Sequence, residues 1–278
     1  MDVLRISYLP EADAFRAQVA RVTDRTIMRS EGGRRLRAGA RAKGPLVSII
    51  SVAFRAREEL PALLESIIAV RDDRTELIVI DGGSNEGSVE VLRGFGESID
   101  YWVSEPDGGI YDAMNIGIAA ATGQFVLHLN AGDRLRCIPW QELEQALADN
   151  IDVACFALKI EGCRTYRPRT GFFLRFANTW HHQGTFYRRK THLGYRTQYR
   201  IFGDFDLNQR MMKAGKSVRL SNTVVAEVIG AGVSADMSNY REQYSVVKQN
   251  FGTPYVCLAL IWRCVWPAIV AVKRWARR

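Results

Sequence analysis

The sequence lacks the cysteine patterns of structural zinc sites and disulfide frameworks. Its five cysteines are an odd number, and none belongs to a Cys-x-x-Cys pair. Zinc ribbons and disulfide-stapled secreted domains depend on such pairs or on an even set of cysteines. We therefore expect neither a zinc site nor a disulfide framework, and we expect a reducing compartment.

Three other signatures are missing. Residues 1–30 are polar and contain several arginines instead of the apolar core of a secretory signal, so we expect no such signal. No Gly-x-Gly-x-x-Gly follows the first predicted strand, which disfavours a dinucleotide oxidoreductase. The segment Phe54-Arg55-Ala56-Arg57 has no glycine, which disfavours a nucleotidyltransferase with a Gly-rich loop at that point.

The excess of positive charge is confined to the two ends of the chain. The formal net charge is +8, and basic residues outnumber acidic ones by five in residues 1–44 and by four in residues 273–278. The part between them is near neutral, which argues against a nucleic-acid-binding protein. Basic ends suit contact with anionic lipid, and solvated ends without a partner fit the composition equally well.

Strand and helix patterns alternate from Pro45 onward, after a basic extension (1–44) whose last part, 29–44, is typical of a flexible linker. Alternation of this kind predicts an α/β domain with a mainly parallel sheet. We expect strands at 46–53, 75–80, 100–104 and 124–130, and helices at 58–70, 88–95 and 111–121. Further along we expect a hairpin (151–169), an aromatic-rich loop (178–188), a helix (205–214) and a strand (218–230).

Polar residues follow the expected strands at the points where they end. Asp81 ends the second strand, Asn130 and Asp133 follow the strand at 124–130, and Asp107 lies between them. Ligands of parallel α/β sheets bind beyond the carboxyl ends of the strands. Carboxylates gathered there repel one another unless a cation or ligand hydroxyls share the site.

Three stretches resemble those of a known family: VSIISVAFRAREELPALLESI, ELIVIDGGSNEGS and SEPDGGIYDAMNIGIAAATGQFVLHLNAGD. They resemble glycosyltransferase family 2, with the GT-A fold, and its bacterial branch for exopolysaccharide, O-antigen or colanic-acid-type repeats. The resemblance covers residues 45–235. It implies a nucleotide-sugar-binding half at 45–135 and an acceptor-binding half at 136–235.

The resemblance also implies which residues meet the donor. Asp81 resembles the carboxylate that holds the uracil or ribose, and the main chain near Ser51 and Ala53 would line the base pocket. Asp107 and Asn115 resemble polar residues near the ribose and diphosphate.

The segment Asn130-Ala131-Gly132-Asp133 stands at the place of the family's D-x-D motif. There, carboxylates hold Mg²⁺ or Mn²⁺ against the diphosphate, which gathers negative charge as the glycosidic bond breaks. Asp133 alone remains as a strong metal ligand. One carboxylate with substrate phosphates and waters can still hold Mg²⁺.

The segment Phe202-Gly203-Asp204-Phe205-Asp206-Leu207 resembles the family's E-D-x-D-L. Asp204 takes the place of the general base that deprotonates the acceptor hydroxyl in an inverting displacement. Asp206 is the alternative base, unless it pairs with Arg210 one helical turn later. Gly203 replaces the family's glutamate.

The stretch His181-His182-Gln183-Gly184-Thr185-Phe186 resembles the family's H-Q-x-x-F on the floor of the acceptor site. The resemblance implies that His182 and Gln183 bind the acceptor. We also expect Arg188 and Asp206 on the acceptor side, where the guanidinium of Arg188 could bind a phosphate. Adjacent residues of an extended chain point to opposite sides, so we do not expect both histidines to hold one ion.

The C-terminal segment 236–278 is strongly apolar from Tyr255 to Val272. Arg263 and Pro267 interrupt it, and a central arginine opposes insertion as a span. Tryptophans and terminal basic residues favour a helix on the membrane surface. A helix that closes the core, or a homodimer contact, is the alternative.

These features together predict an inverting glycosyltransferase of the hexosyltransferase type. It would move a sugar from a UDP- or GDP-linked donor to a saccharide or lipid-linked saccharide in bacterial surface polysaccharide synthesis, with Mg²⁺ or Mn²⁺ as cofactor. We expect a cytoplasmic protein, peripheral on the inner face of the cell membrane. A catalytically inactive nucleotide-sugar-binding protein on the same fold is the alternative.

Overall fold

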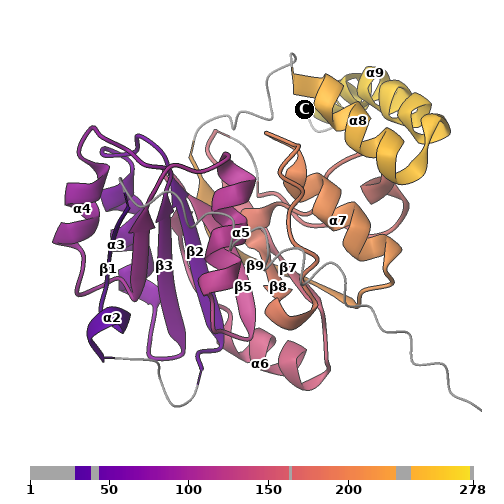
Figure 1. Cartoon of the computed structure of the whole chain (residues 1–278). Coiled ribbons are helices and arrows are strands. Elements are labelled where there is room, and N and C mark those ends of the chain that lie inside the picture. The colour runs from indigo at the N-terminus through magenta and orange to yellow at the C-terminus, as the bar shows by residue number, and fades with distance from the viewer. Residues whose placement is uncertain (1–28, 39–43, 163–164, 230–238, 276–278) are drawn as a thin grey trace, which may run out of the picture.

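The structure is a computed structural model that describes residues 29–38, 44–162, 165–229 and 239–275 (Figure 1). Within these residues a mixed sheet runs in the order β1-β4-β3-β2-β5-β8-β7-β9-β6. Its strands are β1 (Ser30–Gly32), β2 (Val47–Ala53), β3 (Thr75–Asp81), β4 (Tyr101–Ser104), β5 (Phe125–Asn130), β6 (Arg134–Leu135), β7 (Val153–Ile160), β8 (Thr185–Arg188) and β9 (Val218–Val228). The helices are α2 (Arg35–Ala38), α3 (Leu60–Val70), α4 (Ser88–Gly94), α5 (Ile110–Ala120), α6 (Trp140–Ala148), α7 (Gly203–Lys213), α8 (Tyr240–Phe251) and α9 (Thr253–Trp275). Three short 3₁₀ helices complete it: η1 (Phe172–Arg175), η2 (His182–Gly184) and η3 (Arg189–Thr191).

The first half of the sheet confirms the predicted α/β class. Strands β4, β3, β2 and β5 are parallel neighbours, and every residue of β2 and β3 is buried. Helices cover both faces of such a sheet, which is why its strands are mostly apolar instead of alternating between apolar and polar residues. Helix α5 lies in front of the strands in Figure 1 and α3 behind them.

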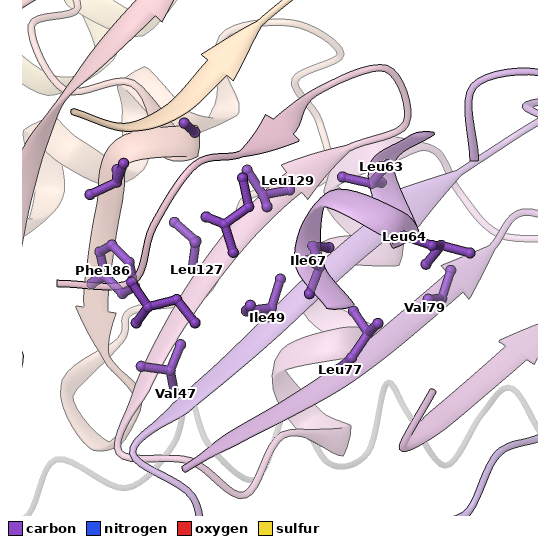
Figure 2. Close-up of a cluster of buried hydrophobic side chains, with 14 of the residues drawn as sticks. Val47, Ile49, Leu63, Leu64, Ile67, Leu77, Val79, Leu127, Leu129 and Phe186 are labelled. Atoms are coloured by element: carbon purple, nitrogen blue, oxygen red, sulfur yellow. The ribbon is translucent and has the colours of Figure 1, made fainter. Parts of the chain in front are cut away.

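The two faces of the sheet contain separate hydrophobic clusters. Figure 2 shows the cluster under α3, where Leu63, Leu64 and Ile67 lie on one side of the helix because helical residues three and four apart share a face. They pack on alternate residues of β2, β3 and β5, among them Ile49 and Leu127. The other residues of the same strands, such as Ile50, belong to the second cluster beneath α5 and α7.

The strand order reverses between β2 and β5. The chain passes from β2 outward to β3 and β4, and then returns to place β5 on the other side of β2. In open α/β sheets such a reversal leaves a crevice beyond the carboxyl ends of the two strands, where ligands bind. Ala53 ends β2 and Asn130 ends β5, so this crevice coincides with the expected donor site.

The second half of the sheet is less regular than the sequence indicated. The expected hairpin at 151–169 is reduced to one bridge between Leu158 and Tyr166, and β7 pairs instead with β9 and β8. The expected loop at 178–188 contains η2 and β8. Helix α6 was not predicted, whereas α8 lies in the C-terminal segment 236–278, which was expected to be helical.

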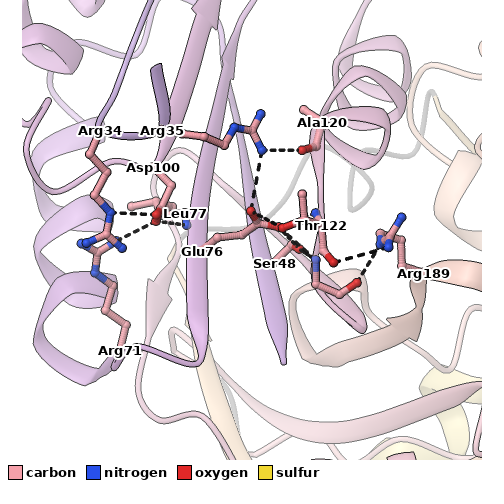
Figure 3. Close-up of polar contacts among 11 residues, drawn as sticks. Arg34, Arg35, Ser48, Arg71, Glu76, Leu77, Asp100, Ala120, Thr122 and Arg189 are labelled. Atoms are coloured by element: carbon pink, nitrogen blue, oxygen red, sulfur yellow. Dashed lines mark hydrogen bonds and ion pairs between the residues drawn. The ribbon is translucent and has the colours of Figure 1, made fainter. Parts of the chain in front are cut away.

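Residues 29–38 are not a flexible linker. Strand β1 pairs antiparallel with β4 at the edge of the sheet, and two of the arginines that suggested a linker, Arg34 and Arg35, form ion pairs with buried carboxylates (Figure 3). Arg34 Nε lies 2.7 Å from Asp100 Oδ1, and Arg35 Nη1 lies 3.7 Å from Glu76 Oε2. The charges of Arg34 and Arg35, which the sequence suggested were solvated, are therefore neutralised by ion pairs within the fold. Residues 1–28 and 39–43 lie outside the described part of the chain.

Helices α8 and α9 form a helical hairpin against α7 (Figure 1). None of the described helices is long and apolar enough to cross a membrane. Helix α9 continues through Arg263, whose guanidinium lies 3.7 Å from the centre of the Tyr240 ring of α8. This arginine is therefore turned toward the protein.

Candidate active site

A tight turn follows β5 at the crevice. The amide of Asp133 donates to the carbonyl of Asn130 (3.0 Å), and the amide of Asn130 donates to Asp133 Oδ2 (2.9 Å). Gly132 has φ of 99°, a conformation that glycine adopts without strain. The turn holds Asp133 5% exposed, and this burial raises the pKa of the carboxyl above its ordinary value of 3.8.

Hydrogen bonds connect the three motifs that the sequence singled out. Asn130 Nδ2 lies 3.1 Å from His182 Nε2, and His182 Nδ1 lies 3.2 Å from Asp204 Oδ2. If the Asn130 amide donates, Nε2 is the acceptor and Nδ1 carries the proton that binds Asp204. The end of β5, the histidine of η2 and the first turn of α7 are thus connected by one chain of hydrogen bonds.

Asp204 is held by several donors at the start of α7. Its Oδ1 accepts from the amide of Phe205 (2.7 Å), and its Oδ2 accepts from Asn178 Nδ2 (3.1 Å) as well as from His182. The side chain is 9% exposed. These hydrogen bonds fix the orientation of the carboxylate at the amino-terminal end of α7, where the helix dipole favours negative charge. Asn178 belongs to no motif that the sequence revealed.

The residues around Asp133 fit a hard divalent cation. Asn130 Oδ1 and Gln183 Oε1 are both buried without a hydrogen-bond partner among the described residues, and the Gln183 side chain bonds to Asp133. One carboxylate and two amide oxygens are the ligand types that Mg²⁺ and Mn²⁺ prefer. No group of three or more His, Cys, Asp or Glu gathers as a metal site within the described residues, so substrate phosphates and waters would have to complete the shell.

Asp81 shapes the loop after β3. It is fully buried, and its carboxylate accepts hydrogen bonds from the amide of Ser84 (2.8 Å) and the hydroxyls of Ser84 and Ser104 (2.6 Å each). Ser51 is also fully buried, inside β2. Ala53 ends β2, and its carbonyl accepts from the amide of Gly82 (2.9 Å).

An exposed aromatic ring stands beside this loop. Phe54 follows the end of β2 and is 62% exposed. A side chain at Gly82 would meet the Phe54 ring at 3.2 Å and Asp107 Oδ2 at 3.1 Å, so the three residues lie together at the crevice. Sequence reasoning placed Asp107 there and missed Phe54, although its position directly after the first parallel strand was the available signal.

Three predicted site residues have other contacts in the structure. Asn115 exchanges two hydrogen bonds of 2.8 Å with the main chain of Tyr195. Asp206 is fully buried and paired with Arg210 (2.7 Å), the alternative that the helical spacing offered. It also binds Arg196 and Asn250, so it forms part of the packing of α7.

Arg188 lies at the other end of the sheet. It pairs with Phe125, the first residue of β5, whereas the site begins at Asn130, the last residue. Its guanidinium stacks 5.4 Å from the centre of the Phe125 ring. The structure thus separates Arg188 from His182 and Gln183, with which the motif grouped it.

The adjacent histidines point apart, as expected. His181 packs edge-on against Tyr166 with 4.4 Å between ring centres, and burial lowers its pKa. His182 faces Asn130 and Asp204. Only His182 therefore belongs to the site.

The ring of Tyr111 fills the space of the missing glutamate. A Cβ added at Gly203 would lie 2.7 Å from the Tyr111 ring. That ring stacks on Tyr195 with 5.3 Å between centres, and its hydroxyl donates to the carbonyl of Ile201 (2.6 Å). The absence of the glutamate is therefore matched by a local repacking.

Comparison with known proteins identifies the family. The sequence matches the family described as Glycosyl transferase family 2 over residues 48–213, and the chain belongs to this family. Over 91 residues it is 46% identical to an uncharacterized glycosyltransferase of Mycobacterium tuberculosis; the match covers 32% of this chain and 35% of that protein, so the chain spans about a third of that relative. It is 30% identical over 177 residues to a PGL/p-HBAD biosynthesis glycosyltransferase of Mycobacterium bovis, which covers 60% of this chain and 69% of that one.

Solved structures share the fold at low sequence identity. S. aureus TarS 1-349 in complex with UDP-GlcNAc has a TM-score of 0.55 at 17% identity, covering 72% of this chain and 64% of that one. The mannosyltransferase PcManGT from Pyrobaculum calidifontis, in complex with GDP-Man and Mn²⁺, has a TM-score of 0.55 at 15% identity, covering 81% and 70%. These likenesses show that the chain has the fold of these structures, in agreement with its membership of glycosyltransferase family 2.

Proposed function

We propose that the chain transfers a sugar from a nucleoside-diphosphate donor to an acceptor hydroxyl with inversion, and that Asp204 is the general base. The observation that carries the proposal is the hydrogen-bonded chain from Asn130 through His182 to Asp204 at the strand-order reversal. In this proposal the Asp204 carboxylate lies beside the expected position of the donor diphosphate and does not contact it. An inverting displacement needs that separation, since the hydroxyl attacks C1 from the face opposite the leaving group.

The base and its partners have distinct roles in this proposal. Asp204 removes the acceptor proton as the hydroxyl attacks. His182 and Asn178 fix the orientation of the carboxylate through the 3.2 Å and 3.1 Å contacts. Gln183 and His182 border the acceptor, whereas Arg188 and Asp206 are left out of the site by their contacts.

The donor side consists of the turn after β5 and the loop after β3. Phe54, next to Asp107 and Gly82, offers a face on which a nucleobase can stack, while Asp81 holds the loop in shape. Asp133, Asn130 and Gln183 would hold Mg²⁺ or Mn²⁺. Such an ion supplies Lewis-acid stabilisation of the departing diphosphate. UDP-linked and GDP-linked donors both fit the proposal, since the similar structures contain UDP-GlcNAc and GDP-Man with Mn²⁺.

The proposed acceptor is a saccharide or lipid-linked saccharide of the bacterial surface, and the proposed setting is the inner face of the cell membrane. The similarity to a PGL/p-HBAD biosynthesis glycosyltransferase supports a role in a biosynthetic pathway that attaches sugars. A polysaccharide of the exopolysaccharide or O-antigen type is a further candidate.

The substitution Asp204→Asn tests the base. It keeps the shape of the side chain and removes its basicity, so we expect transfer to fall ~10³-fold while nucleotide binding persists. The matched control is Asp149→Asn, an exposed carboxylate that pairs with Arg219. Transfer and donor hydrolysis are measured with UDP- and GDP-sugars and Mn²⁺.

The same preparations separate the two candidate functions. Thermal shift with nucleoside diphosphates reports donor binding independently of turnover. Binding without turnover in the wild type, for every donor tried, would favour an inactive nucleotide-sugar-binding protein. Full activity of the Asp204→Asn variant would refute the assignment of the base.

A further inference from the structure

Two segments far apart in the sequence form one exposed aromatic and aliphatic surface. In η1, Phe172 is 52% and Phe173 40% exposed; in α9, Leu258, Ile261 and Val265 are between 37% and 58% exposed. The two are in contact, because the Phe173 and Trp262 rings lie 5.0 Å apart. We call these residues of η1 and α9 the apolar ridge.

The exposed positions of α9 follow helical spacing. Leu258, Ile261 and Val265 are three and four residues apart and therefore share one face. Arg263 lies on the other side, stacked on Tyr240 and bonded to the Tyr244 hydroxyl (3.4 Å). The cation that interrupts the apolar sequence is therefore absent from the ridge.

The segments that form the ridge contain no acidic residue. Neither 162–203 nor 252–278 has an Asp or Glu, whereas both contain several arginines. Arg167 and Arg169 are exposed just before η1, and neither forms an ion pair with a carboxylate of the described residues. A second copy of this face would bring like charges together, while an anionic surface would complement them.

The ridge borders the proposed base. The carbonyl of Arg169 accepts from the Thr179 hydroxyl (2.6 Å) and from Trp180 Nε1 (2.8 Å). The neighbouring Asn178 donates to Asp204 Oδ2 (3.1 Å). A surface that binds the ridge therefore meets the protein beside the acceptor side of the site.

We propose that the apolar ridge seats in an anionic phospholipid bilayer, with Arg167 and Arg169 on lipid phosphates. Phe172 and Phe173 insert into the headgroup zone together with the exposed face of α9. An acceptor anchored in that bilayer then presents its terminal sugar next to Asp204. The identity of the site as a transferase site rests on the proposed function, whereas binding of the bilayer does not.

Vesicle co-sedimentation tests the proposal with the full chain. Vesicles are made of phosphatidylcholine alone or of phosphatidylcholine with phosphatidylglycerol. We expect the wild type to bind the anionic vesicles more tightly than the neutral ones. The double variant Phe172→Ser/Phe173→Ser should bind roughly 10-fold more weakly to both, because apolar area is removed. Leu36→Ser, an exposed leucine on α2, should bind like the wild type.

The arginines are tested in the same assay. Each basic group near an anionic surface contributes ~1 kcal/mol, which is about 5-fold in partitioning. Arg167→Gln/Arg169→Gln should therefore lose most of the preference for anionic vesicles and keep the weak binding to neutral ones. Arg37→Gln/Arg93→Gln, which removes two exposed arginines elsewhere, should keep the preference.

Three outcomes would overturn the proposal. The first is a wild type that does not sediment with anionic vesicles, and the second is a Phe172/Phe173 variant that binds vesicles as well as the wild type. The third is a wild-type dimer that is lost in the Phe172/Phe173 variant, which would assign the ridge to contact with a second copy of the chain. Circular dichroism confirms that each variant is folded. Asp204→Asn should bind vesicles normally, and the ridge variants should keep donor binding in thermal shift, so failure of the surface and failure of the base are told apart.

Discussion

At the amino-terminal ends of the parallel strands the buried carboxylates are fully paired, whereas at the carboxyl ends buried polar atoms are left without partners. Glu76 accepts from the Thr122 hydroxyl (2.9 Å) and the Gly123 amide (3.0 Å), as well as from Ser48 and the Thr122 amide, and it faces Arg35 (Figure 3). At the other end Asn130 Oδ1 and Gln183 Oε1 have no partner among the described residues.

The paired carboxylate of Glu76 stabilises the fold, whereas the unpaired oxygens of Asn130 and Gln183 are available to a ligand. A buried polar atom without a partner costs free energy, so a fold retains such atoms where a ligand can satisfy them. At the amino-terminal ends the Glu76 carboxylate already accepts hydrogen bonds from Ser48, Thr122 and Gly123, so it needs no ligand. The comparison therefore predicts opposite phenotypes for substitutions at the two ends.

Asp133→Asn should have the largest effect at the unsatisfied end. It removes the one strong ligand for a divalent cation, so we expect a loss of activity of at least ~10²-fold, on the scale of single charge-stabilising groups in active sites. The metal-free variant should be more stable to heat than the wild type at neutral pH, because a desolvated charge is gone. Activity with and without Mn²⁺, and thermal unfolding with chelator, check the two effects. A variant that Mn²⁺ still activates would show that Asp133 is not a ligand.

Glu76→Gln should show the reverse pattern at the satisfied end. It weakens a charge-assisted network that joins Arg35 to β2 and α5, and we expect ~1–3 kcal/mol less free energy of unfolding. Activity per folded molecule should be unchanged. Urea denaturation and active-site titration measure the two quantities. A large fall in specific activity without loss of stability would remove the distinction between the two ends.

Gly203→Ala tests the packing beside the base. The new methyl group would press on the Tyr111 ring at 2.7 Å, and overpacking of this kind costs ~1–3 kcal/mol. Tyr111→Ala removes the ring, so the double variant should be more stable than the sum of the two single effects predicts. A double-mutant cycle of unfolding free energies provides the measurement. Additive effects would mean that the two positions do not contact each other.

The pH dependence of metal binding should show the smallest of these effects. Burial raises the pKa of Asp133 above 3.8, and a cation binds the ionised form. Affinity for Mn²⁺ should therefore fall at a higher pH than an exposed aspartate would give. The stability of the metal-free protein depends on pH in the opposite direction. Protonated Asp133 stabilises the folded state at pH values below its pKa in the unfolded chain. This stabilisation is lost as the pH rises through the higher pKa of Asp133 in the folded state. Mn²⁺ titrations across the acidic range check this, with Asp133→Asn as the control that has no such pH dependence.

The central part of the fold could be predicted because its strands are buried on both faces. The runs at β2, β3 and β5 are mostly apolar, and the structure places them within one or two residues of the expected bounds. Strand β1 was missed because its neighbouring arginines suggest solvent. Their partners, Asp100 and Glu76, lie far along the chain, and no local pattern announces such pairs.

Site residues could be predicted where a family motif specifies their role. They could not be predicted where their position depends on the course of the chain in three dimensions. Asp204, His182 and Asp133 follow from the family resemblance, and the structure brings them together. The short spacing between His182 and Arg188 did not reveal that β8 begins between them and positions Arg188 next to Phe125, at the amino-terminal end of β5 and away from the site. Asn178 had no pattern, because its role depends only on a contact formed in three dimensions.

The fit of Tyr111 against Gly203 also sets the order in which sequences can change. A lineage or an engineer that restores the family's glutamate at 203 while the tyrosine is present meets the ring first. The ring must leave before the carboxylate can arrive, and the intermediate contains a hole beside the base. The two positions are 92 residues apart in the sequence but share one contact, so a glutamate grafted at 203 has to be introduced together with a smaller residue at 111.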